Sequence, residues 1–262
     1  MRTGKFIIGI LLLCCFIRMV IGEPCTVPSG SMEPTLLCGD RLWINKLAYG
    51  GRFPTRWADI PLLNVFTWIR PLRLADEENH WEYRRLPGYS EPKQGDIAVF
   101  NSPADPQLLL VKRIVRVVKR GEPIRVDRRT LPLYRSLILR DGGKVIEKGG
   151  EIYINGKAGS RYVPKRNFYY MEGDNRMHSH DSRSFGFISE EAIVGKFDFV
   201  LFSLDPQKQG WRSIRLQRTL MRLFQKKNLI LCRCRLCHSS ARTTVQQSGF
   251  HGHEWHFLVI LI

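Results

Sequence analysis

An apolar run near the N-terminus constrains this chain more than any other feature. Residues 6–22 read FIIGILLLCCFIRMVIG, and Arg18 is the only charged residue among them. This length lies at the lower limit for a helix that spans a bilayer, about 17–25 residues. Arg2 and Lys5 precede the run without any acidic residue, which favours a cytoplasmic N-terminus, 1–5, and export of the remainder of the chain. We therefore expect 6–22 to be a transmembrane anchor.

A cleavable signal peptide is the alternative interpretation of the same run. It requires a small-x-small cleavage site, and the stretch from Gly22 to Cys25, GEPC, offers none. Arg18 is compatible with a spanning helix because a long basic side chain near the outer end can reach the interface. An uncleaved anchor is the favoured interpretation.

The composition is strongly basic. The chain has 262 residues, with 41 Lys and Arg against 24 Asp and Glu, which gives a net charge of +17. Such an excess favours an anionic partner, either a nucleic acid or an acidic membrane surface. We find no nucleic-acid-binding module and no interleaving of aromatic with basic residues, so we expect a phospholipid membrane and no nucleic acid.

The seven cysteines show no spacing typical of a disulfide framework. Cys232, Cys234 and Cys237, followed by His238, faintly resemble a metal cluster, but the paired second half of such a site is missing. We expect no metal and no organic cofactor.

Short apolar and β-branched runs predict strands along most of the chain. A hairpin is expected at 151–157 because Asn155-Gly156 is a favoured two-residue turn. Residues 47–91 are interpreted as an irregular insertion and 120–148 as hairpin material. The pattern predicts a mostly β protein with helix only at its two ends, and with further strands at 95–100, 108–118, 168–173 and 192–204.

The segment 205–227 is basic and amphipathic. Placing 211–227 on a helix gathers Arg212, Arg215 and Arg218 with two further basic residues on one side and apolar residues on the other. A helix lying on an anionic membrane and an ordinary packed helix with a solvated face both fit this pattern. The tail, 228–262, shows no periodicity, and its role is unassigned.

Four blocks carry the chemistry. PSGSMEPTLLCGDRLWINK begins at Pro28 and places a serine in a tight, exposed turn. QGDIAVF, VKRIV and GDNRMHSHDSRSFG come after it in that order, the last trailed by IVGK. In these blocks the chain resembles the bacterial type I signal peptidases over roughly 23–202. The resemblance implies an extracytoplasmic β catalytic domain, 23–204, with a smaller β insertion lobe and with insertions at about 47–91 and 119–165.

The resemblance also implies roles for individual residues. Ser31 matches the nucleophile and Lys112 the general base of a Ser–Lys dyad. Ser29 matches the hydroxyl that joins the Ser31 backbone N–H in an oxyanion hole, and Ser179 the serine that orients the lysine. The remaining matches are a supporting charge cluster, Arg113, Asp174, Asp181 and Arg183, and substrate-pocket positions for small side chains of the signal peptide, Cys25, Val27 and Val111.

Elementary chemistry restricts where such a lysine can work. With a pKa of ~10.4, lysine is only about 0.1% neutral near pH 7.4, so a lysine base must be desolvated. Lowering its pKa to roughly 8 costs about 3 kcal/mol. The run LLLVKRIV places Lys112 among apolar neighbours on a strand, where Lys112 and Arg113 point to opposite faces.

A Ser-His-Asp triad using His178 or His180 with Asp181 is the competing interpretation of the same loop. We reject it because family members usually carry Asp-Asn where this chain has Met177-His178, so neither histidine inherits a role. The family's Pro-Gly-Asp after the lysine strand is also absent here. These departures affect the 177–180 loop and the path into the insertion lobe.

The function implied by the resemblance is removal of signal peptides from secreted preproteins by a serine endopeptidase. It would act through an acyl-enzyme, as a single-pass protein of the bacterial cytoplasmic (inner) membrane with its catalytic domain on the extracytoplasmic side. The alternatives are a catalytically inactive membrane scaffold, a nucleic-acid-binding protein and a self-cleaving repressor. The repressor would carry DNA-binding helices before the serine in place of an apolar run.

Overall fold

The computed structural model describes residues 2–60, 69–78, 81–106, 108–148, 151–158 and 161–220. The tail, 228–262, and its cysteine and histidine cluster lie outside these residues. So does the end of the predicted amphipathic segment, from 221 onward.

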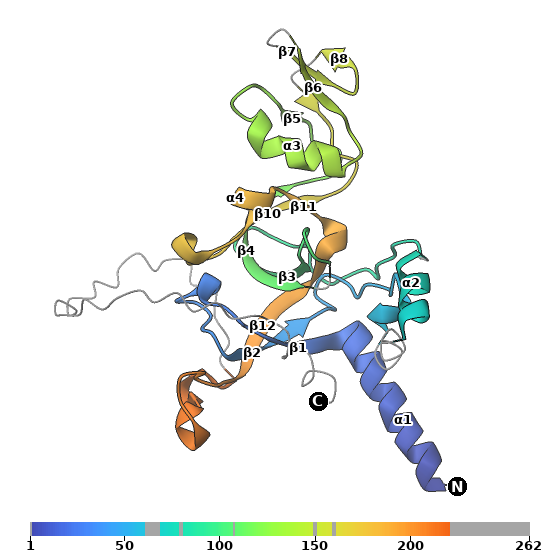
Figure 1. Cartoon of the computed structure of the whole chain (residues 1–262), viewed down its shortest axis with the longest axis vertical. Helices are drawn as coiled ribbons and strands as arrows, with labels where there is room; N and C mark the ends of the chain where they lie inside the picture. Colours follow the sequence, from blue (N-terminus) through green and yellow to red (C-terminus); the bar gives the residue numbers. More distant parts are fainter. Residues whose placement is uncertain are drawn as a thin grey trace, which may run out of the picture. The chain divides into compact units, whose positions relative to one another are not determined.

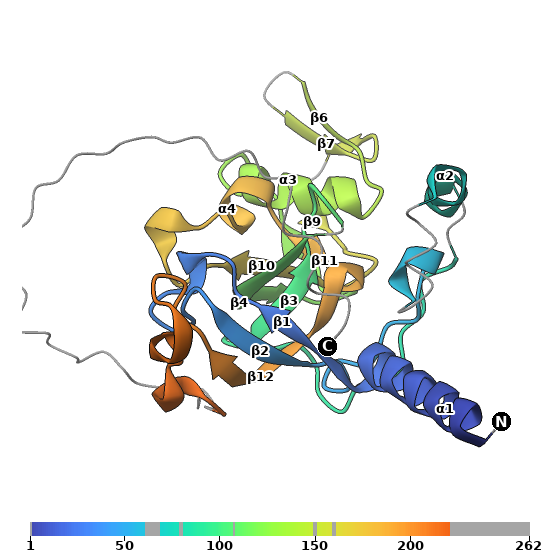
Figure 2. The ribbon, with the colours of Figure 1, turned by 60° about the horizontal axis from the view of Figure 1, so that its bottom comes forward.

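A seven-stranded antiparallel sheet forms the centre of the protein (Figure 2). The four strands predicted for this sheet are confirmed, and three further strands complete it, two at one edge and one at the other. In spatial order the strands are β1 (Gly22–Thr26), β2 (Asp40–Asn45), β12 (Ile193–Ser203), β3 (Ile97–Asn101), β4 (Leu109–Val118), β10 (Phe168–Glu172) and β11 (Ile188–Ser189).

Alternation along β3 explains why both faces of the sheet are covered. Ile97 and Val99 enter one apolar cluster, whereas Ala98 and Phe100 enter another on the opposite face. Phe100 is completely buried, and burial of such a side chain contributes about 1.5–3 kcal/mol. Two buried faces make this central strand a rigid base for the neighbouring β4, which carries Lys112.

The second insertion forms a lobe with its own apolar cluster at one end of the sheet (Figure 1). The prediction of hairpin material was wrong for α3 (Leu131–Arg140), whose Leu131, Leu137 and Ile138 are buried in that cluster. The 151–157 hairpin is confirmed, with Asn155 and Gly156 at positive φ in its turn. The short strands of the lobe are β5 (Ile124–Arg125), β6 (Val145–Lys148), β7 (Glu151–Ile154), β8 (Lys157–Ala158) and β9 (Arg161–Tyr162).

The first insertion, 47–91, also contains a helix that the sequence analysis did not predict, α2 (Arg70–Glu78), after a 3-10 turn at Trp57–Asp59. Helix is therefore not restricted to the ends of the chain. Two arginines attach this insertion to the sheet. Arg52 donates to the carbonyl of Glu191, and Arg85 donates to the carbonyls of Glu190 and Ile193.

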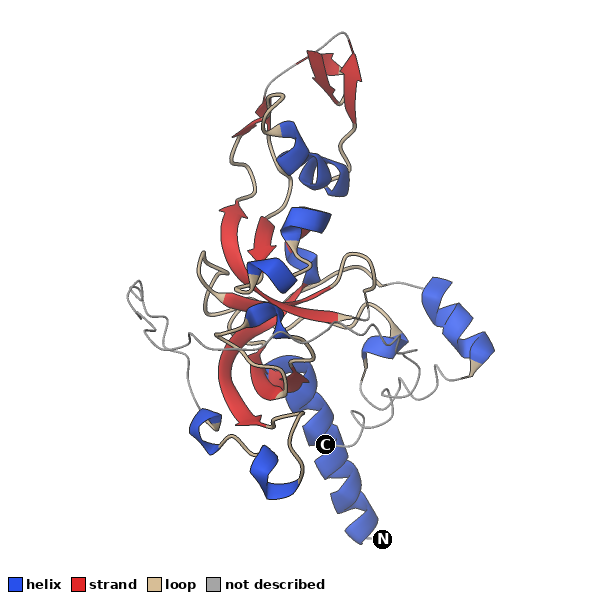
Figure 3. Ribbon diagram, turned by 60° about the vertical axis from the view of Figure 1, so that its left-hand side comes forward, coloured by secondary structure: helices blue, strands red, loops and turns tan. Residues whose placement is uncertain are grey.

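The N-terminus is helical. α1 (Arg2–Phe16) continues into a π-helical turn at Ile17–Ile21 and then into β1 (Figure 3). By length and composition, the 18 residues Gly4–Ile21 suffice to cross a membrane, with a mean hydropathy of 2.3 and no residue buried in the protein. Arg18 is paired with Glu23 at 3.6 Å, and Glu23 also pairs with Lys46, so Arg18 has an acidic partner where the helix meets the sheet.

The predicted C-terminal helix is absent from the described part of its segment. Residues up to Leu220 form two 3-10 turns, Gly210–Ser213 and Leu216–Arg218. Helical periodicity was misleading because Arg215 and Arg218 do not face solvent as a stripe. Arg215 donates to the carbonyl of Cys38 and Arg218 donates to Asp40, at the start of β2.

Candidate active site

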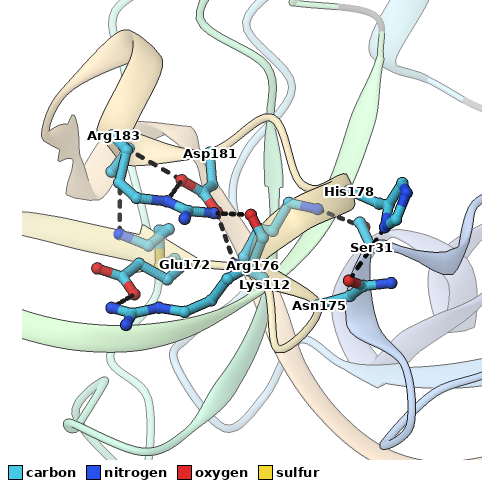
Figure 4. A network of polar contacts seen from close by, with 11 residues as sticks. Ser31, Lys112, Glu172, Asn175, Arg176, His178, Asp181 and Arg183 are labelled. Atoms are coloured by element: carbon cyan, nitrogen blue, oxygen red, sulfur yellow. Dashed lines mark hydrogen bonds and ion pairs between the residues drawn. The ribbon is translucent and has the colours of Figure 1, made fainter.

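Ser31 and Lys112 are in direct contact (Figure 4). The Nζ atom of Lys112 lies 2.5 Å from the Oγ atom of Ser31. Both residues are buried, with 7% of Ser31 and 3% of Lys112 exposed. The two residues are 81 positions apart in the sequence, and the sheet brings them together because β4 runs beside the turn that carries Ser31.

The serine lies in a 3-10 turn, Gly30–Met32, between β1 and β2. Met32 is buried in the apolar cluster on one face of the sheet, and this packing attaches the turn to the core. From the other side, the backbone N–H of Asn175 donates to the Ser31 carbonyl at 3.1 Å, and the Asn175 side chain donates to the Gly30 carbonyl. The turn that carries Ser31 is therefore held between the core and the 173–181 loop.

Burial determines the proton affinity of Lys112. Desolvation lowers the pKa of its ammonium group below the ordinary value of 10.5, and the negative charges of Asp181 and Asp174 act in the opposite direction without cancelling the effect. A lysine whose neutral form is favoured in this way can accept the proton of the Ser31 hydroxyl. The contact between the two side chains then runs from the hydroxyl to the amine.

Ser29 and the three residues predicted to line the substrate pocket belong to the same part of the fold. The Ser29 hydroxyl donates to Ser31 Oγ at 3.3 Å, so in this structure the two hydroxyl groups are bonded to each other. Val27 and Val111 belong to one buried cluster, and Cys25 packs against it. Burial raises the pKa of the Cys25 thiol to about 11, which keeps it protonated and apolar in character. The three residues predicted to line the substrate pocket therefore belong to one apolar cluster, and their role in binding stays a prediction.

The predicted charge cluster consists of two separate ion pairs. Arg113 donates to both carboxylate oxygens of Asp174, at 2.8 and 2.6 Å. Asp174 also accepts from the Thr35 hydroxyl at 2.6 Å. Burial alone would raise the pKa of Asp174, but hydrogen bonds from Arg113 and Thr35 lower it overall. This pair links the strand of Lys112 to the segment that follows Ser31.

The second pair joins Arg183 and Asp181. Arg183 donates to both oxygens of Asp181, each at 2.8 Å, and the Gly173 N–H donates to the same carboxylate at 3.0 Å. Burial opposes ionisation of Asp181, yet these hydrogen bonds outweigh it and lower the pKa. Asp181 is fully buried, so the pair closes the 173–181 loop on itself.

Ser179 lies in this loop against Gly173. A Cβ atom at position 173 would clash with the Ser179 hydroxyl and with the Ser31 carbonyl oxygen, so glycine is required for this approach. The Ser179 hydroxyl contributes to the lowered pKa of Asp181 but is buried without a hydrogen bond of ordinary geometry. The hydrogen bond expected between Ser179 and Lys112 is not formed, and the lysine-orienting role stays a prediction.

The two histidines of the loop are turned to other partners. The Nδ1 atom of His178 lies 3.4 Å from the Asn175 side-chain oxygen, as Figure 4 shows. The ring of His180 packs edge-on against Phe185. Within the described residues, neither histidine has a hydrogen bond to Ser31 or Lys112, and Asp181 is engaged by Arg183.

Sequence reasoning missed several residues that hold the site. Thr35 and Asn175 lie inside the quoted blocks, close in sequence to Ser31 and Asp174. This proximity was the signal that could have identified them. Arg218 had no such signal because the periodicity placed it on a basic helix face, directed either at an anionic membrane or at solvent. The described residues contain no group of three or more His, Cys, Asp or Glu arranged to hold a metal ion.

Comparisons with known proteins identify the family of this chain. A family model described as signal peptidase, peptidase S26, matches residues 1–202. Signal peptidase I of Pseudomonas aeruginosa is 29% identical over 74% of this chain and 69% of its own length. Signal peptidase I of Rickettsia typhi is 29% identical over 74% of this chain and 77% of its own. Signal peptidase I T of Bacillus subtilis is 31% identical over 80% of this chain and 89% of its own.

These matches, with a serine buried against a lysine on a mostly β fold, define a serine peptidase acting on peptide bonds. The chain belongs to the signal peptidase family, peptidase S26.

Proposed function

We propose that this chain is a membrane-anchored endopeptidase that removes signal peptides from translocated preproteins through a Ser31–Lys112 dyad. The observation that carries the proposal is the 2.5 Å contact between Lys112 Nζ and Ser31 Oγ, with both residues buried. The names of the relatives support the substrate class, signal-peptide-bearing proteins.

In the proposed reaction, neutral Lys112 accepts the Ser31 hydroxyl proton as Oγ attacks the scissile carbonyl carbon. The resulting oxyanion accepts hydrogen bonds from the Ser31 N–H and, after a rotation away from Ser31, from the Ser29 hydroxyl. Lys112 then returns the proton to the leaving amine, which leaves an acyl-enzyme on Ser31. Water activated by the same amine hydrolyses that ester and restores the serine.

The proposed location follows from the N-terminus. The apolar helix anchors the chain in the bacterial cytoplasmic membrane, and Arg2 and Lys5 hold the N-terminus on the cytoplasmic side. The catalytic sheet follows directly at β1, so it lies on the extracytoplasmic side, where a translocated preprotein presents its cleavage site.

The test is cleavage of a detergent-solubilised preprotein by the purified full chain, with the new N-terminus of the product identified by sequencing. We expect one cut after a small residue at the end of the signal peptide with the wild type, and no product with Ser31→Ala. A Ser31→Ala variant that cleaves at the wild-type rate would contradict the proposal. A folded wild type without any cleavage or acylation would favour the inactive-scaffold alternative.

A further inference from the structure

The first insertion exposes three large aromatic side chains that the catalytic site does not use. Phe53, Trp57 and Trp81 are 50%, 51% and 44% exposed, and we call them the aromatic patch. The rings of Trp57 and Trp81 meet edge to face, with centroids 5.2 Å apart. Phe53 and Trp81 also line an open cavity with Pro54, Glu82 and Arg84. Such a grouping of exposed aromatic surface marks an interaction site more often than a scattered residue does.

The backbone holds the aromatic patch in a fixed arrangement. The Trp81 N–H donates to the Thr55 carbonyl at 2.8 Å, and the Phe53 N–H donates to the Arg84 carbonyl at 3.0 Å. The Asp59 carboxylate accepts from the backbone N–H groups of Thr55 and Arg56, which closes the turn that carries Trp57. The patch is thus prearranged and does not need to be ordered when a partner binds.

The base of the patch lies against the C-terminal end of the apolar N-terminal helix. Gly51, two residues before Phe53, approaches the backbone of Val20 and Met19 so closely that a Cβ atom there would lie 3.3 Å from the Val20 carbonyl oxygen. Lys46 donates to the Arg18 carbonyl in the same region. Figures 1 and 2 show α2 and α1 on the same side of the sheet, with α2 set apart from the helix.

This location determines the chemistry of the partner. When α1 crosses a bilayer, its C-terminal end lies at the interface between headgroups and acyl chains. Tryptophan is enriched at that depth because its ring is apolar and its N–H is polar. The residues 47–91 carry acidic and basic residues in equal number, so the insertion has no net charge with which to bind an anionic macromolecule.

We propose that the aromatic patch inserts into the phospholipid interface beside the anchor and forms a second membrane contact. Because Arg52 and Arg85 fix the insertion to the strand region at 190–193, this contact sets the tilt of the catalytic sheet above the membrane. A single helix leaves the domain free to rotate about its exit point, whereas two contacts do not. The inference depends on the membrane location given under Proposed function.

The test uses the full chain in phosphatidylcholine vesicles whose acyl chains are brominated near the headgroup. Bromine quenches tryptophan emission only at short range, so it reports which indoles lie in the lipid. The difference between wild type and Trp57→Phe/Trp81→Phe isolates the emission of the two patch residues. We expect brominated lipid to quench this difference emission and aqueous iodide to leave it largely unquenched. Phenylalanine keeps an apolar ring at both positions, so the fold is preserved.

The matched control adds Ile146→Trp to the double variant, because Ile146 is similarly exposed, at 57%, but belongs to the insertion lobe. Its emission should be quenched by iodide and not by brominated lipid. Difference emission that iodide quenches and brominated lipid does not would overturn the proposal. Emission protected from both quenchers would also overturn it, and would indicate a protein surface as the occupant.

A separate measurement distinguishes failure of the patch from failure of the membrane location. Extraction of the vesicles at alkaline pH reports the anchor alone. If the chain resists extraction but shows no lipid quenching, the anchor is retained and the proposal for the aromatic patch is contradicted. A chain that is extracted contradicts the membrane-anchored function itself. Salt should not change the quenching, because the contact is apolar.

Discussion

Arg218, near the end of the described residues, donates two hydrogen bonds to Asp40. Its Nη2 atom lies 2.6 Å from Oδ2 and its Nε atom 3.2 Å from Oδ1. Asp40 is fully buried at the start of β2. The same guanidinium donates to the Thr35 carbonyl at 3.0 Å, and the Thr35 hydroxyl donates to Asp174. The segment around Arg218 therefore supports the loop between the nucleophile and β2.

We predict that Arg218→Ala lowers the free energy of unfolding by about 3–5 kcal/mol, because it leaves the Asp40 carboxylate buried without its ion pair. Asp40 has a lowered pKa at present: burial would raise it, and hydrogen bonds from Arg218, Ser203 and Leu37 outweigh that effect. Urea unfolding of the full chain in detergent measures the change. Arg212→Ala is the control, since its side chain lies in an exposed turn. Equal stability of the two variants would show that the pair is unimportant.

The tail is predicted to be dispensable. A chain that ends after Lys227 keeps Arg218 and the whole of the catalytic sheet, so we expect wild-type cleavage and wild-type membrane association. Preprotein cleavage and fractionation of membranes measure the two properties. Loss of cleavage by a folded, membrane-bound truncation would show that 228–262 contributes to the site. Activity that depends on zinc and is lost in Cys232→Ser would revive the metal interpretation.

Gly173→Ala is predicted to reduce cleavage without abolishing folding. The added methyl group meets the Ser179 hydroxyl and the Ser31 carbonyl oxygen, so the nucleophile turn and the 173–181 loop must move apart. Overpacking of this kind costs about 1–3 kcal/mol. We expect kcat to fall more than KM rises, because the displaced group is the nucleophile and not a pocket wall. A variant with unchanged kcat would show that this approach is not needed for catalysis.

The rate of cleavage is predicted to rise with pH through the pKa of Lys112. The protonated amine is inactive as a base, and burial places its pKa below 10.5. The active fraction therefore increases about tenfold for each pH unit well below that pKa. The ascending limb should lie above the range in which histidine titrates, and His178→Ala and His180→Ala should leave it in place. A limb near pH 6.5 that disappears in His180→Ala would favour a histidine base.

The central strands could be predicted because local pattern and tertiary packing agree in them. In β4 the run of apolar and β-branched residues indicates the strand. The burial of Lys112 was expected from its apolar neighbours together with the resemblance, and Lys112 is buried. The 151–157 turn was similarly local, since Asn155 and Gly156 adopt the positive φ values that they favour.

The errors occurred where tertiary contacts decide the structure. The residues of α3 form a helix because Leu137 and Ile138 pack into the lobe cluster, and this partner surface is distant in sequence. The 210–218 region has helical periodicity but forms 3-10 turns, because Arg215 and Arg218 bond to Cys38 and Asp40, more than 170 positions away. No local pattern reports such contacts.

The candidate site was accessible from the sequence only through the resemblance of its blocks. Chemistry alone indicated that a lysine base must be buried, but it did not pair Lys112 with Ser31. The division of the charge cluster into Arg113–Asp174 and Arg183–Asp181 depends on the fold of the 173–181 loop. The lack of a hydrogen bond between Ser179 and Lys112 in the described site also depends on the fold of this loop.

The most direct test of the dyad is a cycle of Ser31→Ala, Lys112→Ala and the double variant in the same preprotein-cleavage assay. Circular dichroism should confirm that each purified variant is folded. Residues that act as one catalytic unit are not additive, so the account predicts that each single change abolishes cleavage and that the double variant is no worse than either. Substantial cleavage by Lys112→Ala, or losses that add in the double variant, would contradict the Ser31–Lys112 mechanism.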